Sequence, residues 1–234
     1  MAWVAEENFD SYSTGDLDTK NGGSGWSAAW VATSGTMTVS TGEFLNSPNS
    51  VLTSNAGGGY YTRVLTSTFS TGVLYFAAYM AAGAAGFVFN LRDGGLSTMG
   101  ITLTAGGDIQ ILRRTPSISW LTVGTYSDDT MYIFEMDIDI TSDQYRIRWK
   151  EEGGSYGSYT SYVTPRTTNA IDRVTLNANS GATAKYFDAL SASDPDSGPT
   201  TSIKSLNGLS IASVKSRNGL AIASIKSING LSNV

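Results

Sequence analysis

Two residue types are missing from this chain of 234 residues, which has no cysteine and no histidine. Without Cys there is no disulfide framework and no thiolate nucleophile, and without His there is no imidazole base and no zinc site of the usual kind. Acid-base chemistry is therefore left to carboxylates, Lys, Tyr and hydroxyl groups. The lack of Cys fixes no redox compartment, because it suits a cytosolic and an extracellular fold equally.

Charged residues are scarce, at 15%, and the formal net charge is −5 with a sequence pI of about 4.7. This balance argues against nucleic acid or an anionic membrane as the main partner. The charge is uneven: residues 202–234 contain four basic residues and no acid (+4), so the other 201 residues contain 11 basic and 20 acidic groups (−9). The opening "MAWVAEENFD" lacks a basic and then apolar start, which predicts no cleavable secretion signal.

Long apolar runs are also few, and the longest, "VLYFAAYMAAGAAGFVF" at 73–89, has 17 uncharged residues. A membrane helix needs about 20 such residues. The central "AAGAAG" favours a turn between two buried strands, so we expect no membrane insertion.

The residues that are present favour strands over helices. There are 26 Gly and only 5 Pro, and Thr, Ser, Val and Tyr are abundant, a composition typical of pleated, half-buried surfaces joined by tight turns. No stretch of the body shows a sustained apolar period of 3.6 residues. The predicted fold class is all-β, a sandwich or barrel. Strands are predicted at 60–69, 73–80, 86–92, 108–114, 131–140, 144–151, 170–178 and 184–192.

The C-terminal segment differs from the body. Residues 194–201 contain Pro, Gly and Ser and read as a linker. Beyond them, 202–234 repeat the pattern S-[IV]-K-S-x-N-G-L three times with a period of 11. Asn-Gly is a strong signal for a type I′ hairpin turn. Three such short units bury too little to stand alone, so we expect them to pack against copies of themselves or another protein. The repeated residues are Asn207, Gly208, Leu209, Asn218, Gly219, Leu220, Asn229, Gly230 and Leu231.

Four motifs in the body, taken in order, resemble a known family. They are "FDSYSTGDLDTKNGGSGWSAAW" (9–30), "GFVFNLRDGG" (86–95), "FEMDIDITSDQYRIRW" (134–149) and "AKYFDALSAS" (184–193). Together they resemble LamG-like, concanavalin A-like jelly-roll domains of phage structural and bacterial surface proteins. The resemblance implies a jelly-roll sandwich over residues 1–193, with two antiparallel sheets and the first and last strands side by side.

The same resemblance implies a structural calcium ion, a hard cation that takes oxygen ligands. Relatives hold it between an acid near the N-terminus and an Asp of the last strand. The matching positions are Glu7 or Asp10, together with Asp188. Relatives often have two Asp in a row in the last strand, whereas here Asp188 precedes Ala189. The alternative reading is that these are surface acids beside turns.

The stretch "EMDID" places Glu135, Asp137 and Asp139 at every second position, hence on one face of a strand. It resembles the Glu-x-Asp-x-Glu strand of jelly-roll glucanases. A retaining pair needs its carboxyl groups about 5–5.5 Å apart, however, and positions i and i+4 of a strand are about 13 Å apart along the backbone. The alternation is equally that of any half-exposed antiparallel strand. We therefore expect no enzyme activity.

Carbohydrate binding would use exposed aromatic rings set among polar groups. The candidates are Trp120 and Tyr126 in "SWLTVGTY", and Tyr156, Tyr159 and Tyr162 in "SYGSYTSY". The alternative reading is that they are core aromatics and loop tyrosines.

Three functions remain open. The first hypothesis is a non-enzymatic virion structural protein of a phage, decorating a capsid or forming part of a tail or fibre, with the repeats binding other virion proteins or further copies of the chain. The second is a carbohydrate-binding or adhesive module of a bacterial surface protein, with cell-surface glycans as partners. The third is a glucanase.

Overall fold

The computed structural model describes Trp3, residues 5–45, 48–53, 59–179 and 183–195, and the backbone of six two-residue strands in the C-terminal segment. The chain divides into two compact units, Met1–Pro195 and Asp196–Val234. The first unit is called the body and the second the tail.

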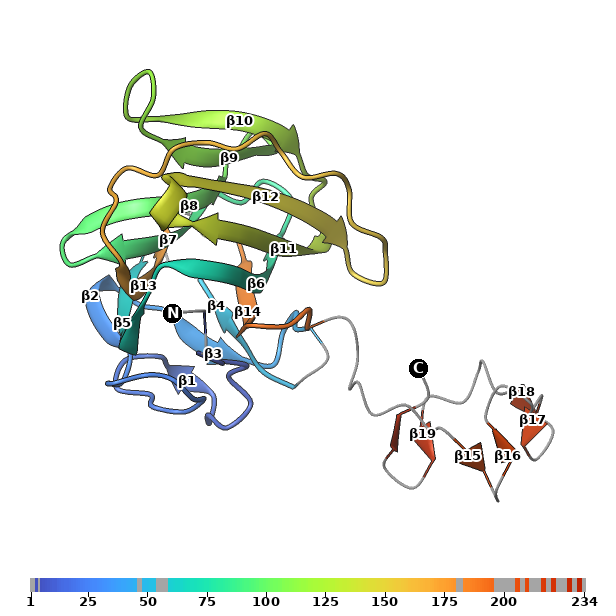
Figure 1. Cartoon of the computed structure of the whole chain (residues 1–234). Coiled ribbons are helices and arrows are strands. Elements are labelled where there is room, and N and C mark those ends of the chain that lie inside the picture. Colours follow the sequence, from blue (N-terminus) through green and yellow to red (C-terminus); the bar gives the residue numbers. More distant parts are fainter. Residues whose placement is uncertain are drawn as a thin grey trace. The chain divides into compact units, whose positions relative to one another are not determined.

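The body consists of two antiparallel seven-stranded sheets (Figure 1). The first sheet contains, in spatial order, β1 (Gly15–Asp16), β3 (Thr38–Ser40), β4 (Ser50–Leu52), β14 (Lys185–Ser191), β6 (Thr71–Met80), β11 (Thr130–Asp139) and β12 (Gln144–Glu151). The second contains β10 (Ser119–Thr125), β9 (Asp108–Arg113), β8 (Leu96–Leu103), β7 (Phe87–Asp93), β13 (Ile171–Ala178), β5 (Gly59–Phe69) and β2 (Val31–Gly35). This is the predicted all-β jelly-roll sandwich.

Both ends of the body meet, as the resemblance implies. Glu7 forms an antiparallel bridge with Leu190 of β14, with hydrogen bonds of 2.8 Å in both directions. The apolar run at 73–89 forms most of β6, a turn and the start of β7, as predicted. In the part of the chain that the structure describes, no helix is long and apolar enough to cross a membrane.

Aromatic side chains fill the space between the sheets. Phe76 of the first sheet stacks on Phe89 of the second with ring centroids 4.3 Å apart, and Phe134 and Phe187 lie around them. On β11, Phe134, Met136 and Ile138 alternate into this core as predicted. Burial of such rings dominates the stabilisation of a sandwich core.

In the tail, each repeat contains a pair of two-residue antiparallel strands. The pairs are β15 (Ser205–Leu206) with β16 (Leu209–Ser210), β17 (Ser216–Arg217) with β18 (Leu220–Ala221), and β19 (Ser227–Ile228) with β20 (Leu231–Ser232). The Asn-Gly pairs predicted as turns, Asn207–Gly208, Asn218–Gly219 and Asn229–Gly230, lie between these strands and outside the described residues.

Candidate functional site

A cavity of about 370 Å³ lies on the outer face of the second sheet. Because Phe87, Phe89 and Leu91 of β7 point into the core, the residues between them point outward. The lining combines strands that are distant in sequence with two connecting segments. It includes Asn90 (β7), Leu112 (β9), Trp120 (β10), Asn177 (β13), and Ile118 and Arg166 from the adjoining loops.

Trp120 forms the apolar rim of this cavity. It lies on β10, the edge strand, where it pairs with Leu112 of β9. Its side chain is 38% exposed, and that of Ile118 is 56% exposed. An exposed indole above a buried Leu, beside polar groups, is the arrangement by which aromatic faces bind small molecules. Trp120, predicted from the sequence as a carbohydrate-binding residue, is thus an exposed residue of this cavity, and its role in binding stays a prediction.

The floor of the cavity contains a polar group without a partner. Asn90 is 6% exposed, and its Oδ1 forms no hydrogen bond within the described residues. Thr175, which pairs with Asn90 across β7 and β13, is fully buried, and its Oγ1 also has no partner there. A buried polar atom left unpaired costs about 1–3 kcal/mol, so it calls for a partner such as a ligand or water.

Gly100 makes room for this amide. It lies opposite Asn90 on the neighbouring strand β8, and a Cβ added to it would be only 2.5 Å from Asn90 Oδ1. The side chain of Asn90 therefore occupies space that any other residue at position 100 would fill. Asn90 and Asn177 were missed in the sequence because strand alternation alone predicts outward polar residues on any half-exposed strand. Arg166 was also missed, and it lies in a loop, where no strand pattern marks it.

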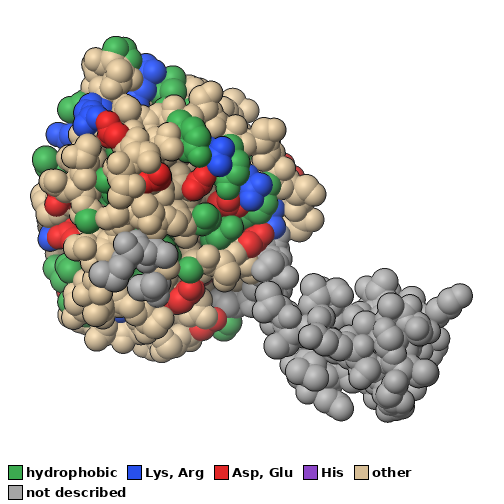
Figure 2. All heavy atoms as spheres, in the orientation of Figure 1, with side chains coloured by type: hydrophobic (Ala, Val, Ile, Leu, Met, Phe, Trp, Pro, Cys, Tyr) green, Lys and Arg blue, Asp and Glu red, His purple; other side chains and the backbone are tan. Residues whose placement is uncertain are grey.

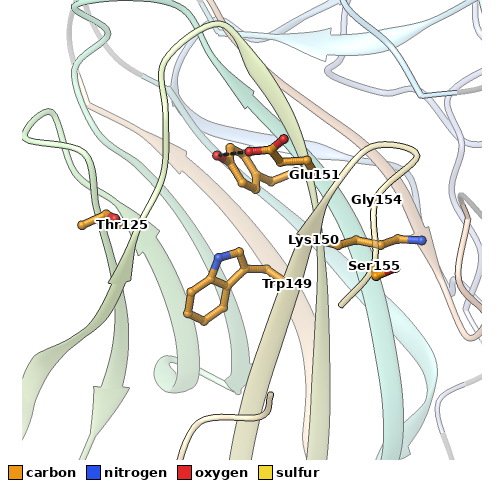
Figure 3. Close-up of a pocket in the computed structure, with 7 residues that line it drawn as sticks. Thr125, Trp149, Lys150, Glu151, Gly154 and Ser155 are labelled. Atoms are coloured by element: carbon orange, nitrogen blue, oxygen red, sulfur yellow. Dashed lines mark hydrogen bonds between the residues drawn. The ribbon is translucent and has the colours of Figure 1, made fainter. Parts of the chain in front are cut away.

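A second cavity, of about 400 Å³, lies beside the end of β12 (Figure 3). Its polar groups are already engaged. Glu151 accepts a hydrogen bond from Tyr132 Oη at 3.3 Å, and Lys150 Nζ donates to Asp194 at 2.9 Å. The amine of Lys150 extends away from the ring of Trp149, on the other side of the strand. This cavity therefore offers a ligand fewer free polar groups than the one beneath Trp120.

The predicted acidic row occupies the outer face of the first sheet, but its carboxylates are paired. Glu135 binds Arg148 at 2.7 Å and accepts a hydrogen bond from Tyr159, and Asp137 binds Arg146 at 2.8 Å. Figure 2 shows acidic, basic and hydrophobic side chains interspersed on this side of the body. No free pair of carboxylates suited to glycoside cleavage results.

Glu135 corrects the prediction that this row is solvent-exposed, whereas Asp137 and Asp139 stay partly exposed. Glu135 is only 2% exposed, because Tyr159 from the segment after β12 lies against it. Asp139 instead accepts a hydrogen bond from the backbone N–H of Ser142 at 3.1 Å, capping the turn that ends β11. Hydrogen bonds from Ser142 and Thr141 lower the pKa of Asp139.

The predicted tyrosines do not form a free sugar platform. The ring of Tyr159 has Arg146 and Arg148 at 4.0 and 4.5 Å from its centroid. Arg146 also lies 4.5 Å from the ring of Tyr162, and Arg148 lies 4.6 Å from that of Tyr156. Such cation–π contacts hold the segment to β12. Tyr162 keeps an exposed fraction of 47%.

Tyr126 belongs to the core, which corrects its prediction as a binding residue. Its side chain is 8% exposed and its hydroxyl donates to the carbonyl of Thr104. Burial, and after it the charges of Asp128 and Asp108, raise the pKa of Tyr126 to about 12.

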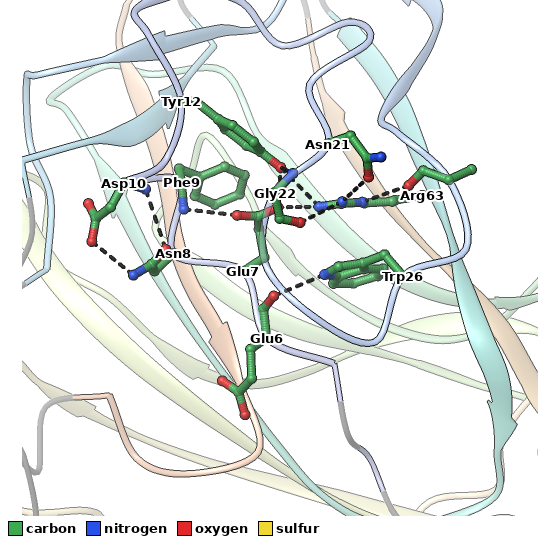
Figure 4. A network of polar contacts seen from close by, with 11 residues as sticks. Glu6, Glu7, Asn8, Phe9, Asp10, Tyr12, Asn21, Gly22, Trp26 and Arg63 are labelled. Carbon is green, nitrogen blue, oxygen red and sulfur yellow. Dashed lines mark hydrogen bonds and ion pairs between the residues drawn. The ribbon is translucent and has the colours of Figure 1, made fainter.

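The predicted calcium ligand Glu7 is bound to a cation of the protein itself (Figure 4). Its carboxylate forms a fully buried ion pair with Arg63 and accepts hydrogen bonds from Tyr12 Oη and the backbone N–H of Phe9. The guanidinium also donates to Asn21 and to the carbonyl of Gly22, and lies 4.7 Å from the ring centroid of Trp26. The carboxylate of Glu7 is thus engaged by Arg63 and is not available as the predicted calcium ligand.

Asp10 and Asp188 are the remaining predicted calcium ligands. Both oxygens of Asp188 accept backbone N–H groups, from Leu45 at 2.8 Å and Ala189 at 2.7 Å. Burial, and after it the charges of Asp10 and Glu7, raise the pKa of Asp188 well above its usual value. Asp10 Oδ1 has no partner within the described residues. Among those residues no group of three or more acidic side chains could hold a metal ion, so the ligands do not fit a calcium site built from side chains alone.

Comparison with known proteins gives a fold and no family. No family model matches the sequence, and neither does any curated protein. Among solved structures, a sialidase is 8% identical with a TM-score of 0.54, over 81% of this chain and 18% of that chain. The exoplasmic/lumenal domain of VIP36 in its metal-free form is 10% identical (TM-score 0.46; 76% and 90% covered), and lectin II from Ulex europaeus is 8% identical (TM-score 0.40; 68% and 94% covered). The chain thus spans less than a fifth of the sialidase, and the likeness concerns the jelly-roll fold.

Proposed function

We propose that the body is a carbohydrate-binding module whose binding site is the cavity beneath Trp120. The observation that carries this proposal is the combination of an exposed indole with an unpartnered, nearly buried amide, Asn90, in one cavity. A sugar ring presents an apolar face suited to the indole, and its hydroxyl groups can both donate to and accept from an amide. The volume of about 370 Å³ is that of a small-molecule site.

The site lies on rigid elements. Asn90, Leu112 and Trp120 belong to three strands of one sheet, so their spacing is fixed by backbone pairing. Because these residues are already fixed by the sheet, binding a ligand requires little ordering of side chains or backbone, which limits the entropic cost of binding. The proposed function needs no catalytic residues, which agrees with the paired carboxylates of the first sheet.

The test is glycan-array binding by the full chain and by Trp120→Ala. We expect the unaltered chain to bind a subset of glycans and Trp120→Ala to bind them about tenfold or more weakly, since a buried aromatic anchor contributes about 2 kcal/mol or more. Tyr162→Ala, which removes an exposed aromatic from the segment that lies against β12 of the other sheet, is the matched control and should bind as the unaltered chain does. Equal binding by Trp120→Ala would exclude this cavity as the site.

The virion role and the glucanase activity, the other two functions predicted from the sequence, are not supported by this site. No observation on the described residues favours assembly into a particle, so the virion role stays a prediction from the sequence. The glucanase reading required a free pair of carboxylates, and in the structure Glu135 and Asp137 are each bound to an arginine.

A further inference from the structure

Another cavity, of about 420 Å³, lies on the same outer face as the one beneath Trp120. Its lining includes Val31 (β2), Tyr60 and Thr62 (β5), Arg92 (β7) and Arg173 (β13). Arg92 follows Asn90 by two positions on β7, so the two side chains leave the sheet on the same side.

Strand register makes the two cavities neighbours. Ser97, which lines the cavity beneath Trp120, pairs directly with Arg92, which lines the other. On the next row, Thr175 pairs with Asn90 on one side and with Thr62 on the other. A ligand lying across the strands would therefore pass from Trp120, over Asn90, to Arg92 and Tyr60.

The charge of this face is positive and incompletely compensated. Arg173 is paired with Asp172 at 2.8 Å, whereas within the described residues no carboxylate forms an ion pair with Arg92. The guanidinium of Arg92 donates to the carbonyl of Gly95 and lies 5.6 Å from the ring centroid of Tyr60. Its Nε is buried and has no hydrogen-bond partner there.

The surroundings of Arg92 favour the arrival of an anion. Burial lowers the pKa of Arg92, and the positive charges of Arg173 and Arg166 lower it further, with Asp172 opposing them. Two like charges beside a partly buried guanidinium are unfavourable until an anion neutralises them. A carboxylate is the anion whose planar shape matches a guanidinium.

We infer that the ligand is an acidic saccharide, with one sugar ring against Trp120 and the carboxylate of a neighbouring uronic acid residue on Arg92. This inference rests on the proposed function, to which it adds the charge class and the direction of the ligand. It gives a partner to two unpartnered buried atoms whose residues line the cavities, Asn90 Oδ1 and Arg92 Nε.

The test uses pairs of tetrasaccharides that share stereochemistry and linkage and differ only at C6: β-1,4-glucuronate with cellotetraose, β-1,4-mannuronate with mannotetraose, and α-1,4-galacturonate with α-1,4-galactotetraose. Binding is measured by calorimetry with the full chain. We expect at least one acidic member to bind about tenfold or more tightly than its neutral partner, as a charge-assisted hydrogen bond provides. This preference should shrink as salt is added.

Arg92→Gln should abolish that preference and leave binding of the neutral partner unchanged. Arg146→Gln removes the same charge from the other sheet and is the matched control. Arg92→Lys keeps the charge without the planar guanidinium and should retain part of the preference. If the melting temperature of Arg92→Gln reveals a folding defect, Arg92→Lys still tests the role of the charge. Equal affinity for acidic and neutral members, or a preference that survives Arg92→Gln, overturns this inference alone. Absence of binding to every glycan, on the array and in the pairs, overturns the proposed function with it.

Discussion

At the scale of single residues, Arg63 has an unusual position for a charged side chain. It lies on β5 and is fully buried against the N-terminal segment, where it binds Glu7 and lies 4.7 and 5.7 Å from the ring centroids of Trp26 and Trp30. Its donors reach the carbonyls of Gly22 and Ala28. One guanidinium therefore organises a segment of some twenty residues that contains little regular secondary structure, a task that small domains often give to a metal ion.

Removing Arg63 should be costly. We expect Arg63→Met to lower the free energy of unfolding by about 3–5 kcal/mol, because Glu7 is left as a buried charge without its partner. Urea unfolding at neutral pH measures this loss. Adding Glu7→Gln to Arg63→Met removes the unpaired buried carboxylate and should restore part of the stability. A loss below about 1 kcal/mol in the single variant, the value of an exposed ion pair, would show that the pair is not buried in solution.

Asp188 supplies a second residue-scale prediction, which concerns calcium. Its pKa is raised in the folded chain, so the folded state holds the proton more tightly than the unfolded state does. Stability should therefore rise as the pH falls through the folded pKa towards the unfolded pKa of about 3.9, and Asp188→Asn should reduce this slope. Urea unfolding at several pH values, with a chelator present, measures both slopes.

The same samples test the metal. Since Arg63 engages Glu7, we expect the chelator to leave the melting temperature of the unaltered chain unchanged. A rise in melting temperature on adding Ca²⁺, seen in the unaltered chain and lost in Asp188→Asn, would contradict this and support the calcium ion implied by the family resemblance.

At the scale of elements, the sequence predicted strands where apolar alternation was clear and missed them where Gly or exposure obscured it. β11 and β12 were predicted within a residue or so of their bounds. β8 was missed because Gly100 interrupts its pattern, and Gly100 is needed there to accommodate Asn90. β10 was missed because it is an edge strand that pairs only with β9, so its side chains are mostly half-buried or exposed.

The candidate site could be predicted only in part for a similar reason. Trp120 was identifiable as an aromatic residue in "SWLTVGTY", where polar residues lie nearby. Asn90 and Arg92 lie in "FVFNLR", where two outward polar residues look like those of any half-exposed strand. What distinguishes them is that each has a buried atom without a partner, and this depends on neighbours from β13 and β8 that only the fold supplies.

The same limit explains Glu135. Alternation correctly placed it on the outer face of β11, opposite Arg148 of β12. Its burial depends on Tyr159, which lies in a segment without regular secondary structure that returns along β12, with Thr160 N–H donating to the carbonyl of Ile147 at 2.8 Å. The path of such a segment is set by tertiary contacts such as the arginine–tyrosine stacking, for which the sequence pattern gives no sign.

At the scale of the whole molecule, the tail differs from the body in its net charge and in the length of its strands. Each repeat forms a hairpin of two-residue strands, and an isolated hairpin is at best marginally stable in water. The tail should therefore gain stability by packing against further copies. The net charge of +4 of its repeats at 202–234 and the apolar Leu of each repeat would govern this packing. Self-association through the tail would also present several binding faces together and increase avidity for a repeated glycan.

We expect the full chain to be an oligomer by light scattering and the triple variant Leu209→Ser, Leu220→Ser and Leu231→Ser to be a monomer. The variant keeps the length and charge of the tail, so a difference between the two would identify apolar packing as the cause. Measurement in high salt separates this from attraction between the basic tail and the acidic body, because only the latter is screened. A chain ending at residue 201 should match the variant. Equal masses for all three proteins would show that the repeats do not assemble the chain with itself, and would leave a different protein as their partner.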